Sequence, residues 1–107
     1  MKQECESVFQ TVDVVVTPTT PIPAPRIDEV DKPWRAGPEK AAAALTRFTR
    51  YFNIVGLPGI SIPCGFTMDS LPIGMQIVGK AFDESRILRV AHAYEQDAKW
   101  FERRPPM

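Results

Sequence analysis

Residues 56–66 read GLPGISIPCGF, and this stretch decides how the middle of the chain folds. Gly56 and Pro58 are residue types that end helices, because glycine adopts a left-handed backbone and proline lacks an N–H donor. The apolar residues around Ser61 then form a short β-branched run that favours a strand at 60–62. We therefore predict that a helix ends at Gly56 and that a strand follows.

A second strand is predicted at 73–78, where side chains alternate between the two faces. The pattern places Ile73, Met75 and Ile77 on one face and Gly74, Gln76 and Val78 on the other. The intervening residues 66–72 have the length of a hairpin loop, so the two strands are expected to pair antiparallel. A polar amide such as Gln76 in an apolar strand is typical of an internal hydrogen bond.

The residues before this hairpin predict another strand and a helix. The run VDVVV at 12–16 is typical of a strand buried on both faces, as in the interior of an α/β sheet. The helix is expected to begin near Pro38 and to carry Phe48 and Phe52 at helical spacing. Together with the hairpin, these elements predict an α/β fold in which a few strands of a mixed sheet pack with helices.

A last helix is predicted after Asp83, a residue type that caps helix N-termini. Its apolar side is expected to include Ile87, Leu88 and Ala91, and Phe82 is expected to pack on Ile87 as a hydrophobic staple.

Composition excludes several functional classes. The 107 residues suffice for one domain, and 13 basic residues balance 13 acidic ones, so nothing favours nucleic acid or an anionic membrane as partner. No apolar run approaches the ~20 residues that span a bilayer, and the N-terminus is acidic where a signal peptide is apolar. A cytoplasmic location is expected.

With two cysteines and one histidine, neither a structural zinc site nor another metal site is predicted.

Individual reactive side chains do not form a complete catalytic set. Ser61 comes one residue short of a G-x-S-x-G nucleophile elbow, because Pro63 occupies the second glycine position, so an ordinary strand serine is favoured. Cys64 and His92 could form a thiol–imidazole dyad, but no third group orients the histidine. The acidic residues at 28–31 lie in a proline-rich segment and are interpreted as a solvated loop rather than a calcium site.

Four stretches together resemble the C-terminal end of the amidase signature family. They are VDVVVTPTTPIPAPRIDE (12–29), FNIVGLPGISIPCGF (52–66), LPIGMQIVGKAFDESRILRVAHAYEQ (71–96) and RRPP (103–106). The resemblance implies longer proteins with a large mixed sheet covered by helices on both faces. It also implies hydrolysis of carbon–nitrogen amide bonds, without a cofactor, by a serine, a second serine in a cis peptide bond, and a lysine.

The resemblance supplies no catalytic residue for this chain. The Gly/Ser-rich stretch that carries both serines has no counterpart, and none of the lysines lies in the catalytic context. We therefore expect residues 1–107 to be a single C-terminal portion of an amidase domain, without the N-terminal catalytic portion and inactive in isolation.

Six residues are expected, by resemblance, to border the cavity for a small-molecule amide substrate. They are Thr17, Thr19, Phe52, Asn53, Ile73 and Met75. The A subunit of glutamyl-tRNA(Gln) amidotransferases, which is similar, carries an acidic residue shortly before an Asn-x-x-Gly motif. The corresponding residues 45–50 here, LTRFTR, contain no acid. A general amidase is therefore favoured over that subunit.

Two alternatives stay open. The chain could be a non-catalytic binding or interaction module, or a remnant without function. The interaction module is motivated by missing neighbouring strands, which would leave sheet edges and apolar faces that seek a partner. The expected partner is either the N-terminal portion of an amidase or a second copy of the chain.

Overall fold

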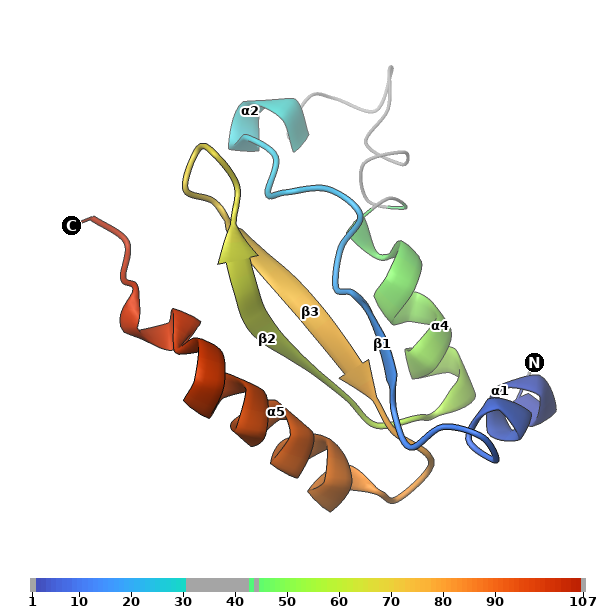
Figure 1. Ribbon diagram of the computed structural model, residues 1–107. Coiled ribbons are helices and arrows are strands. Elements are labelled where there is room, and N and C mark those ends of the chain that lie inside the picture. Colours follow the sequence, from blue (N-terminus) through green and yellow to red (C-terminus); the bar gives the residue numbers. More distant parts are fainter. Residues whose placement is uncertain (1, 31–42, 44, 107) are drawn as a thin grey trace.

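The computed structural model describes residues 2–30, 43 and 45–106 (Figure 1). Its elements are α1 (Lys2–Val8), β1 (Val15–Pro18), α2 (Ile27–Val30), α4 (Arg47–Val55), β2 (Gly59–Phe66), β3 (Pro72–Val78), α5 (Glu84–Ala98) and the 3-10 turn η1 (Trp100–Glu102). No described helix is both long and apolar enough to cross a membrane.

The three strands form an antiparallel sheet in the order β1-β3-β2, with β3 in the middle. Gln76 of β3 is opposite Thr17 on one side and Ser61 on the other. The predicted hairpin is confirmed, although β2 runs further than residues 60–62 and contains a bulge between Pro63 and Gly65. The α/β fold class is confirmed.

Helices cover the two faces of this sheet, α5 on one side and α4 on the other (Figure 1). The α5 face carries a core of Ile62, Ile77, Ile87 and Ala91. The α4 face carries a second core of Val55, Leu57 and Val78. Ile77 and Val78 are adjacent yet belong to different cores, which confirms the alternation predicted for β3.

The first strand differs from its prediction. It spans Val15–Pro18, not residues 12–16, and it is not buried on both faces. Val16 is 54% exposed and Val12 is 41% exposed. The physical reason is its position, because within the described residues β1 pairs with β3 only and forms the edge of the sheet. A run of valines predicts a strand, but it does not specify whether another strand pairs with it on each side.

Helix α4 carries Phe48 and Phe52 as predicted, whereas its predicted start near Pro38 lies outside the described residues. The helix ends where predicted. Gly56 has φ of 73°, in the left-handed region, and its N–H donates to the carbonyl of Phe52 at 3.0 Å.

Helix α5 begins after Asp83 as predicted, but its N-terminus is built differently. Asp83 makes no side-chain cap and instead pairs with Arg86 at 2.7 Å. Phe82 is 94% exposed, so the predicted staple onto Ile87 is wrong. Its left-handed backbone, with φ of 64°, accounts for the different course of the chain at this point. Leu88 is 56% exposed, so its predicted place on the buried side is also wrong.

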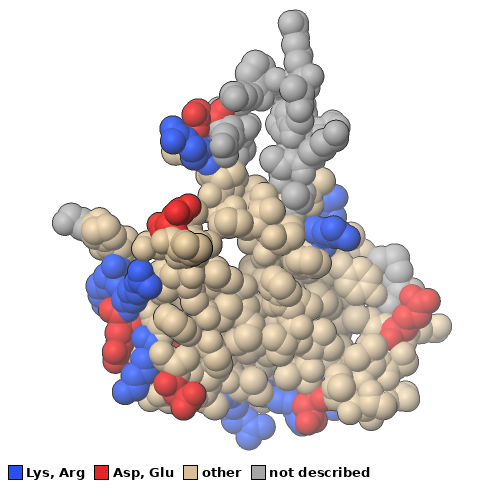
Figure 2. Space-filling view, turned by 45° about the horizontal axis from the view of Figure 1, so that its top comes forward, with Lys and Arg blue, Asp and Glu red and all other residues tan. Residues whose placement is uncertain are grey.

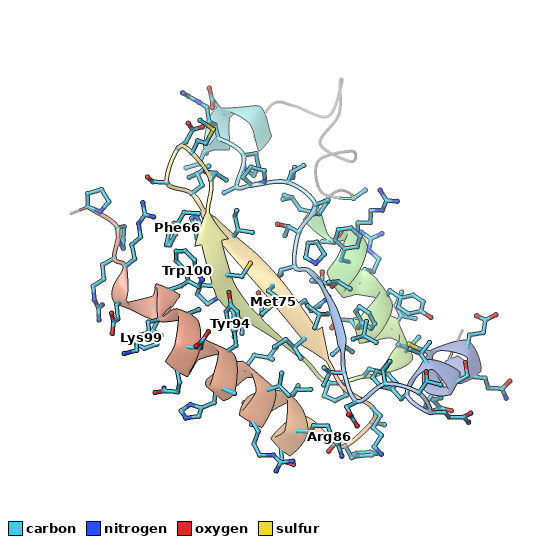
Figure 3. All side chains as sticks on the ribbon, viewed as in Figure 1. Phe66, Met75, Arg86, Tyr94, Lys99 and Trp100 are labelled. Atoms are coloured by element: carbon cyan, nitrogen blue, oxygen red, sulfur yellow. The ribbon has the colours of Figure 1, made fainter. Side chains whose placement is uncertain are left out.

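The end of α5 is held against β2 by aromatic residues. Tyr94, Trp100 and Phe66 lie between the helix and the sheet in Figure 3. The rings of Phe66 and Trp100 meet edge-on with centroids 5.9 Å apart, and the Trp100 indole N–H donates to the Tyr94 hydroxyl at 3.1 Å. These contacts place the residues after α5 beside the hairpin.

Candidate functional site

Two hydroxyl groups from distant parts of the sequence meet on the α4 face. The hydroxyl oxygens of Thr19 and Ser61 lie 2.6 Å apart, although the residues are 42 positions apart in sequence. They meet over Gly74, where an added Cβ would lie 2.8 Å from Thr19 Oγ1 and 3.0 Å from Ser61 Oγ. A glycine at position 74 is therefore what allows this pair to form.

A buried amide extends the same polar region. Gln76 is 6% exposed, and its Nε2 donates to Thr17 Oγ1 at 2.9 Å and to the carbonyl of Phe48 at 3.2 Å. The internal hydrogen bonding predicted for this side chain is confirmed. Because the bonds join β1, β3 and α4, Gln76 fixes the helix relative to the sheet. We call Thr17, Thr19, Ser61 and Gln76 the polar strip.

The structure distributes the six predicted cavity residues over both faces of the sheet. Thr17 and Thr19 belong to the polar strip on the α4 face. Phe52 packs on the core of that face, and Asn53 is exposed on the same helix. Ile73 and Met75 alternate with the residues of the α4 face. Met75 packs on the α5-face core and is labelled in Figure 3.

A cavity of about 260 Å³ includes Gly74 in its lining but none of the four residues of the polar strip. One wall is formed by residues 18 and 20–23, and the other by Thr67, Pro72, Ile73 and Gly74. Its lining contains one predicted cavity residue, Ile73, and ends at Gly74, the residue beneath the Thr19–Ser61 pair. The remaining five predicted residues are not part of this lining.

Sequence reasoning identified Ser61 as an ordinary strand serine but did not anticipate its contact with Thr19. The alternation of the two strands carried part of the signal, since it places Ser61 and Gln76 at opposed positions on one face. Nothing in the sequence indicated where the chain after β1 would run, so the position of Thr19 could not be inferred.

The geometry does not support a nucleophile among the described residues. The Ser61 hydroxyl bonds to another hydroxyl, not to an imidazole, amine or carboxylate that could remove its proton. Cys64 Sγ donates to the carbonyl of Ile73 at 3.5 Å, and His92 is exposed on α5. Within the described part of the chain no group of three metal-ligating residues is present. The polar strip can therefore donate and accept hydrogen bonds, but it lacks an acid–base pair.

Outside this region, the pKa of the Tyr51 side chain is shifted. Desolvation by partial burial, then a hydrogen bond with Cys5 and electrostatic interactions with Cys5 and Glu4, raise the pKa of Tyr51 above its ordinary value of 10.0. Each cause disfavours the phenolate. The pair connects α1 to α4 and supports the packing of the N-terminal helix.

A family model described as Amidase matches residues 1–88. The chain belongs to the amidase family. The resemblance inferred from the sequence is thereby confirmed, and the match covers the polar strip and all three strands.

The similar proteins include amidotransferase A subunits and a hydrolase. The chain is 48% identical over 107 residues to the A subunit of glutamyl-tRNA(Gln) amidotransferase from Synechococcus sp. strain JA-2-3B'a(2-13), covering all of this chain and 20% of that protein. It is 49% identical over 104 residues to the protein of that name in Brevibacillus brevis, covering 96% of this chain and 20% of the relative.

Among solved structures, a 6-aminohexanoate cyclic dimer hydrolase complexed with substrate superposes with a TM-score of 0.84 at 31% identity. That match covers 97% of this chain and 22% of the hydrolase. The A subunit of glutamyl-tRNA(Gln) amidotransferase from Thermotoga maritima superposes with a TM-score of 0.75 at 32% identity, covering 91% of this chain and 20% of that protein. This amidase-family chain thus spans about a fifth of the length of the proteins that it matches.

Proposed function

We propose that this chain supplies scaffold and substrate-pocket wall to an amidase-signature hydrolase that cleaves carbon–nitrogen amide bonds. The observation that carries the proposal is the match of the whole chain to amidase-family proteins of which it covers only 20%. The polar strip fits this role, because hydroxyl and amide groups orient an amide substrate without performing acid–base chemistry.

The isolated chain is proposed to be catalytically inactive. Hydrolysis of an amide requires an activated nucleophile, and Ser61 has no base within hydrogen-bond distance in the described structure. The serine, cis-serine and lysine implied by the amidase-signature resemblance would have to come from the rest of an amidase chain. The substrate is proposed to be a small-molecule amide, the location cytoplasmic, and no cofactor takes part.

The six candidate cavity residues remain part of this proposal, and the structure supports them to different degrees. Thr17 and Thr19 belong to the polar strip, and Ile73 lines the cavity that also contains Gly74. Asn53 is exposed on the helix that flanks the same face. We propose that these residues face the substrate, and that Phe52 and Met75 support the wall from the cores behind it.

A second candidate is a portion of the A subunit of a glutamyl-tRNA(Gln) amidotransferase. Sequence identities of 48% and 49% to two such subunits favour it. Against it stands the absence of an acidic residue at positions 45–50, where the resemblance to that subunit requires one for the amino group of glutamine. An interaction module without any role in catalysis is the remaining alternative.

The test is release of ammonia or amine from glutamine and from a cyclic amide by the purified chain. We expect no release above the uncatalysed reaction, while the full-length Brevibacillus brevis relative serves as positive control for glutamine. Activity that disappears in Ser61→Ala would overturn the proposal of an inactive chain. Restored activity after addition of the rest of an amidase chain would support it, and the preferred substrate would discriminate the two candidates.

A further inference from the structure

A groove of about 670 Å³ lies between the β2–β3 hairpin and the residues that follow α5. Small-molecule sites usually have about 300–1,000 Å³, so the groove has the size of such a site. Its lining is mostly apolar, contains no carboxylate and includes none of the residues of the polar strip. We call it the C-terminal groove. The hairpin contributes Pro63, Phe66, Ser70 and Pro72, and the C-terminal residues contribute 100, 101 and 103–106.

The guanidinium of Arg103 is held in place in this groove. Its Cζ lies 4.0 Å from the centroid of the Phe66 ring, and its Nη2 donates to Ser70 Oγ at 3.2 Å. Ser70 is itself fixed at the end of the hairpin, where its N–H donates to the carbonyl of Thr67 at 2.9 Å. A guanidinium has five N–H donors, so the bond to Ser70 leaves most of them for a ligand. Because the cation is ordered in advance, a ligand has less conformational entropy to remove.

The positive charge of the C-terminal groove is not neutralised by the chain itself. Within residues 2–30, 43 and 45–106, neither Arg103 nor Arg104 forms an ion pair, whereas Arg86 pairs with both Asp13 and Asp83. Figure 2 shows basic side chains gathered at the margin where the chain ends, with acidic side chains nearby. None of the acidic side chains lines the groove. Two uncompensated cations therefore favour an anionic ligand.

Aromatic rings supply the apolar part of the same lining. Trp100 is 36% exposed and Phe101 is 48% exposed, so both rings retain surface that a ligand can cover. The Trp100 indole N–H is already bonded to the Tyr94 hydroxyl, and its ring lies beside Phe66 (Figure 3). These rings offer stacking and edge contacts rather than hydrogen-bond donors. They favour a ligand with a flat apolar body.

We propose that the C-terminal groove binds a small organic carboxylate with an aromatic body. The planar fork of the Arg103 guanidinium matches the two oxygens of a carboxylate, and Arg104 adds a second positive charge. The volume favours one small molecule over an extended peptide. This binding goes beyond the proposed function, because the groove contains none of the residues proposed to face the amide substrate.

The test is an NMR titration of the ¹⁵N-labelled 107-residue chain with 2-naphthoate. The signal followed is the Trp100 indole N–H, which Trp34→Phe assigns because the chain has two tryptophans. The neutral alcohol 2-naphthalenemethanol carries the same rings without the charge. We expect a saturable shift with naphthoate and about tenfold weaker binding of the alcohol.

Three arginine variants separate the roles of charge and shape. Arg103→Gln should weaken naphthoate binding by about tenfold or more, because it removes the charged fork. Since Arg103 also ties the C-terminal residues to the hairpin, Arg104→Gln is the second variant. The Arg104 side chain makes no hydrogen bond or ion pair with another described residue, so this change removes only charge and should cost about threefold.

Arg89→Gln is the matched control, because Arg89 is exposed on α5 and does not line the groove. It removes the same charge and should leave the affinity for naphthoate within about twofold of the wild type. A loss as large as that of Arg103→Gln would mean that net charge alone attracts the ligand, and would overturn the site.

The remaining outcomes decide the class of ligand. Equal affinity for naphthoate and the neutral alcohol would overturn recognition of the carboxylate. Equal binding of inorganic phosphate would overturn the aromatic body. Tighter binding of the acidic peptide Asp-Asp-Glu-Phe would overturn the choice of a small molecule, and no Trp100 shift with any probe would overturn the site itself. None of these results bears on amide hydrolysis, so failure here leaves the proposed function to its own test.

Discussion

The hydroxyls of Thr19 and Ser61 are 2.6 Å apart because Gly74 leaves room for them. An alanine at 74 would place its Cβ 3.1 Å or less from three of their side-chain atoms. The pair is the tightest feature of the polar strip, and it joins the chain after β1 to the hairpin.

Gly74→Ala is therefore expected to destabilise the chain by about 1–3 kcal/mol, the usual cost of overpacking. The measurement is the free energy of unfolding from urea denaturation. Gly59→Ala is the matched control in β2, since its Cβ would meet Val78 at an ordinary 3.7 Å and should change stability by about 0.5 kcal/mol or less. Equal stability of both variants would mean that Thr19 and Ser61 can separate at no cost.

Gln76→Met should cost about 1–3 kcal/mol, because it removes both donors from a buried site. Thr17→Val should cost less, since the Gln76 amide would keep its bond to the carbonyl of Phe48. Denaturant unfolding of both variants shows which substitution lowers the free energy of unfolding more. A larger loss in Thr17→Val would contradict the view that Gln76 is the centre of the network.

Phe82→Gly is expected to stabilise the chain by up to about 1 kcal/mol, because φ of 64° is strained for phenylalanine and accessible to glycine. The exposed ring contributes little packing that could be lost. Phe82→Ala is the control, as it removes the ring and keeps the strain. If thermal unfolding ranks alanine above glycine, the backbone at this position is not the source of the strain.

Alkaline pH should weaken the folded chain through Tyr51. Its pKa is raised in the folded state, so as pH rises through 10.0 the unfolded state loses the proton first and is stabilised. The stability that depends on neutral Tyr51 is complete below that range and declines above it. Unfolding followed across this range should show a shallower decline in Tyr51→Phe than in the wild type. The same slope in both would contradict the assigned shift.

The hairpin and the two faces of β3 were predictable because local patterns determine them. Gly56 and Pro58 mark the end of a helix, and the alternation from Ile73 to Val78 assigns Ile77 and Val78 to different cores. These features need no knowledge of distant residues. The family was predictable for a different reason, namely that four stretches occur in a recognisable order.

The features that escaped prediction depend on contacts that sequence periodicity does not encode. The valine run before Pro18 predicted a doubly buried strand, but its neighbours are set by the tertiary arrangement and Val16 is exposed. The staple by Phe82 failed because a left-handed residue redirected the chain. The Thr19–Ser61 contact spans 42 positions and required the sheet to form first. How the six candidate cavity residues act on a substrate stays a prediction.

The central position of β3 has a consequence for the order of folding. Residues from β2 to α5 are contiguous in sequence and contain the hairpin and the α5-face core, so they can assemble by closing short loops. Strand β1 joins this unit through long-range contacts such as the Thr17–Gln76 bond, which spans 59 positions, and the entropy of closing that long loop opposes it. We therefore expect β1 to be the last strand to add and the first to detach. We expect the thermally weakest part of the sheet to be the strand that carries Val16 and Thr17.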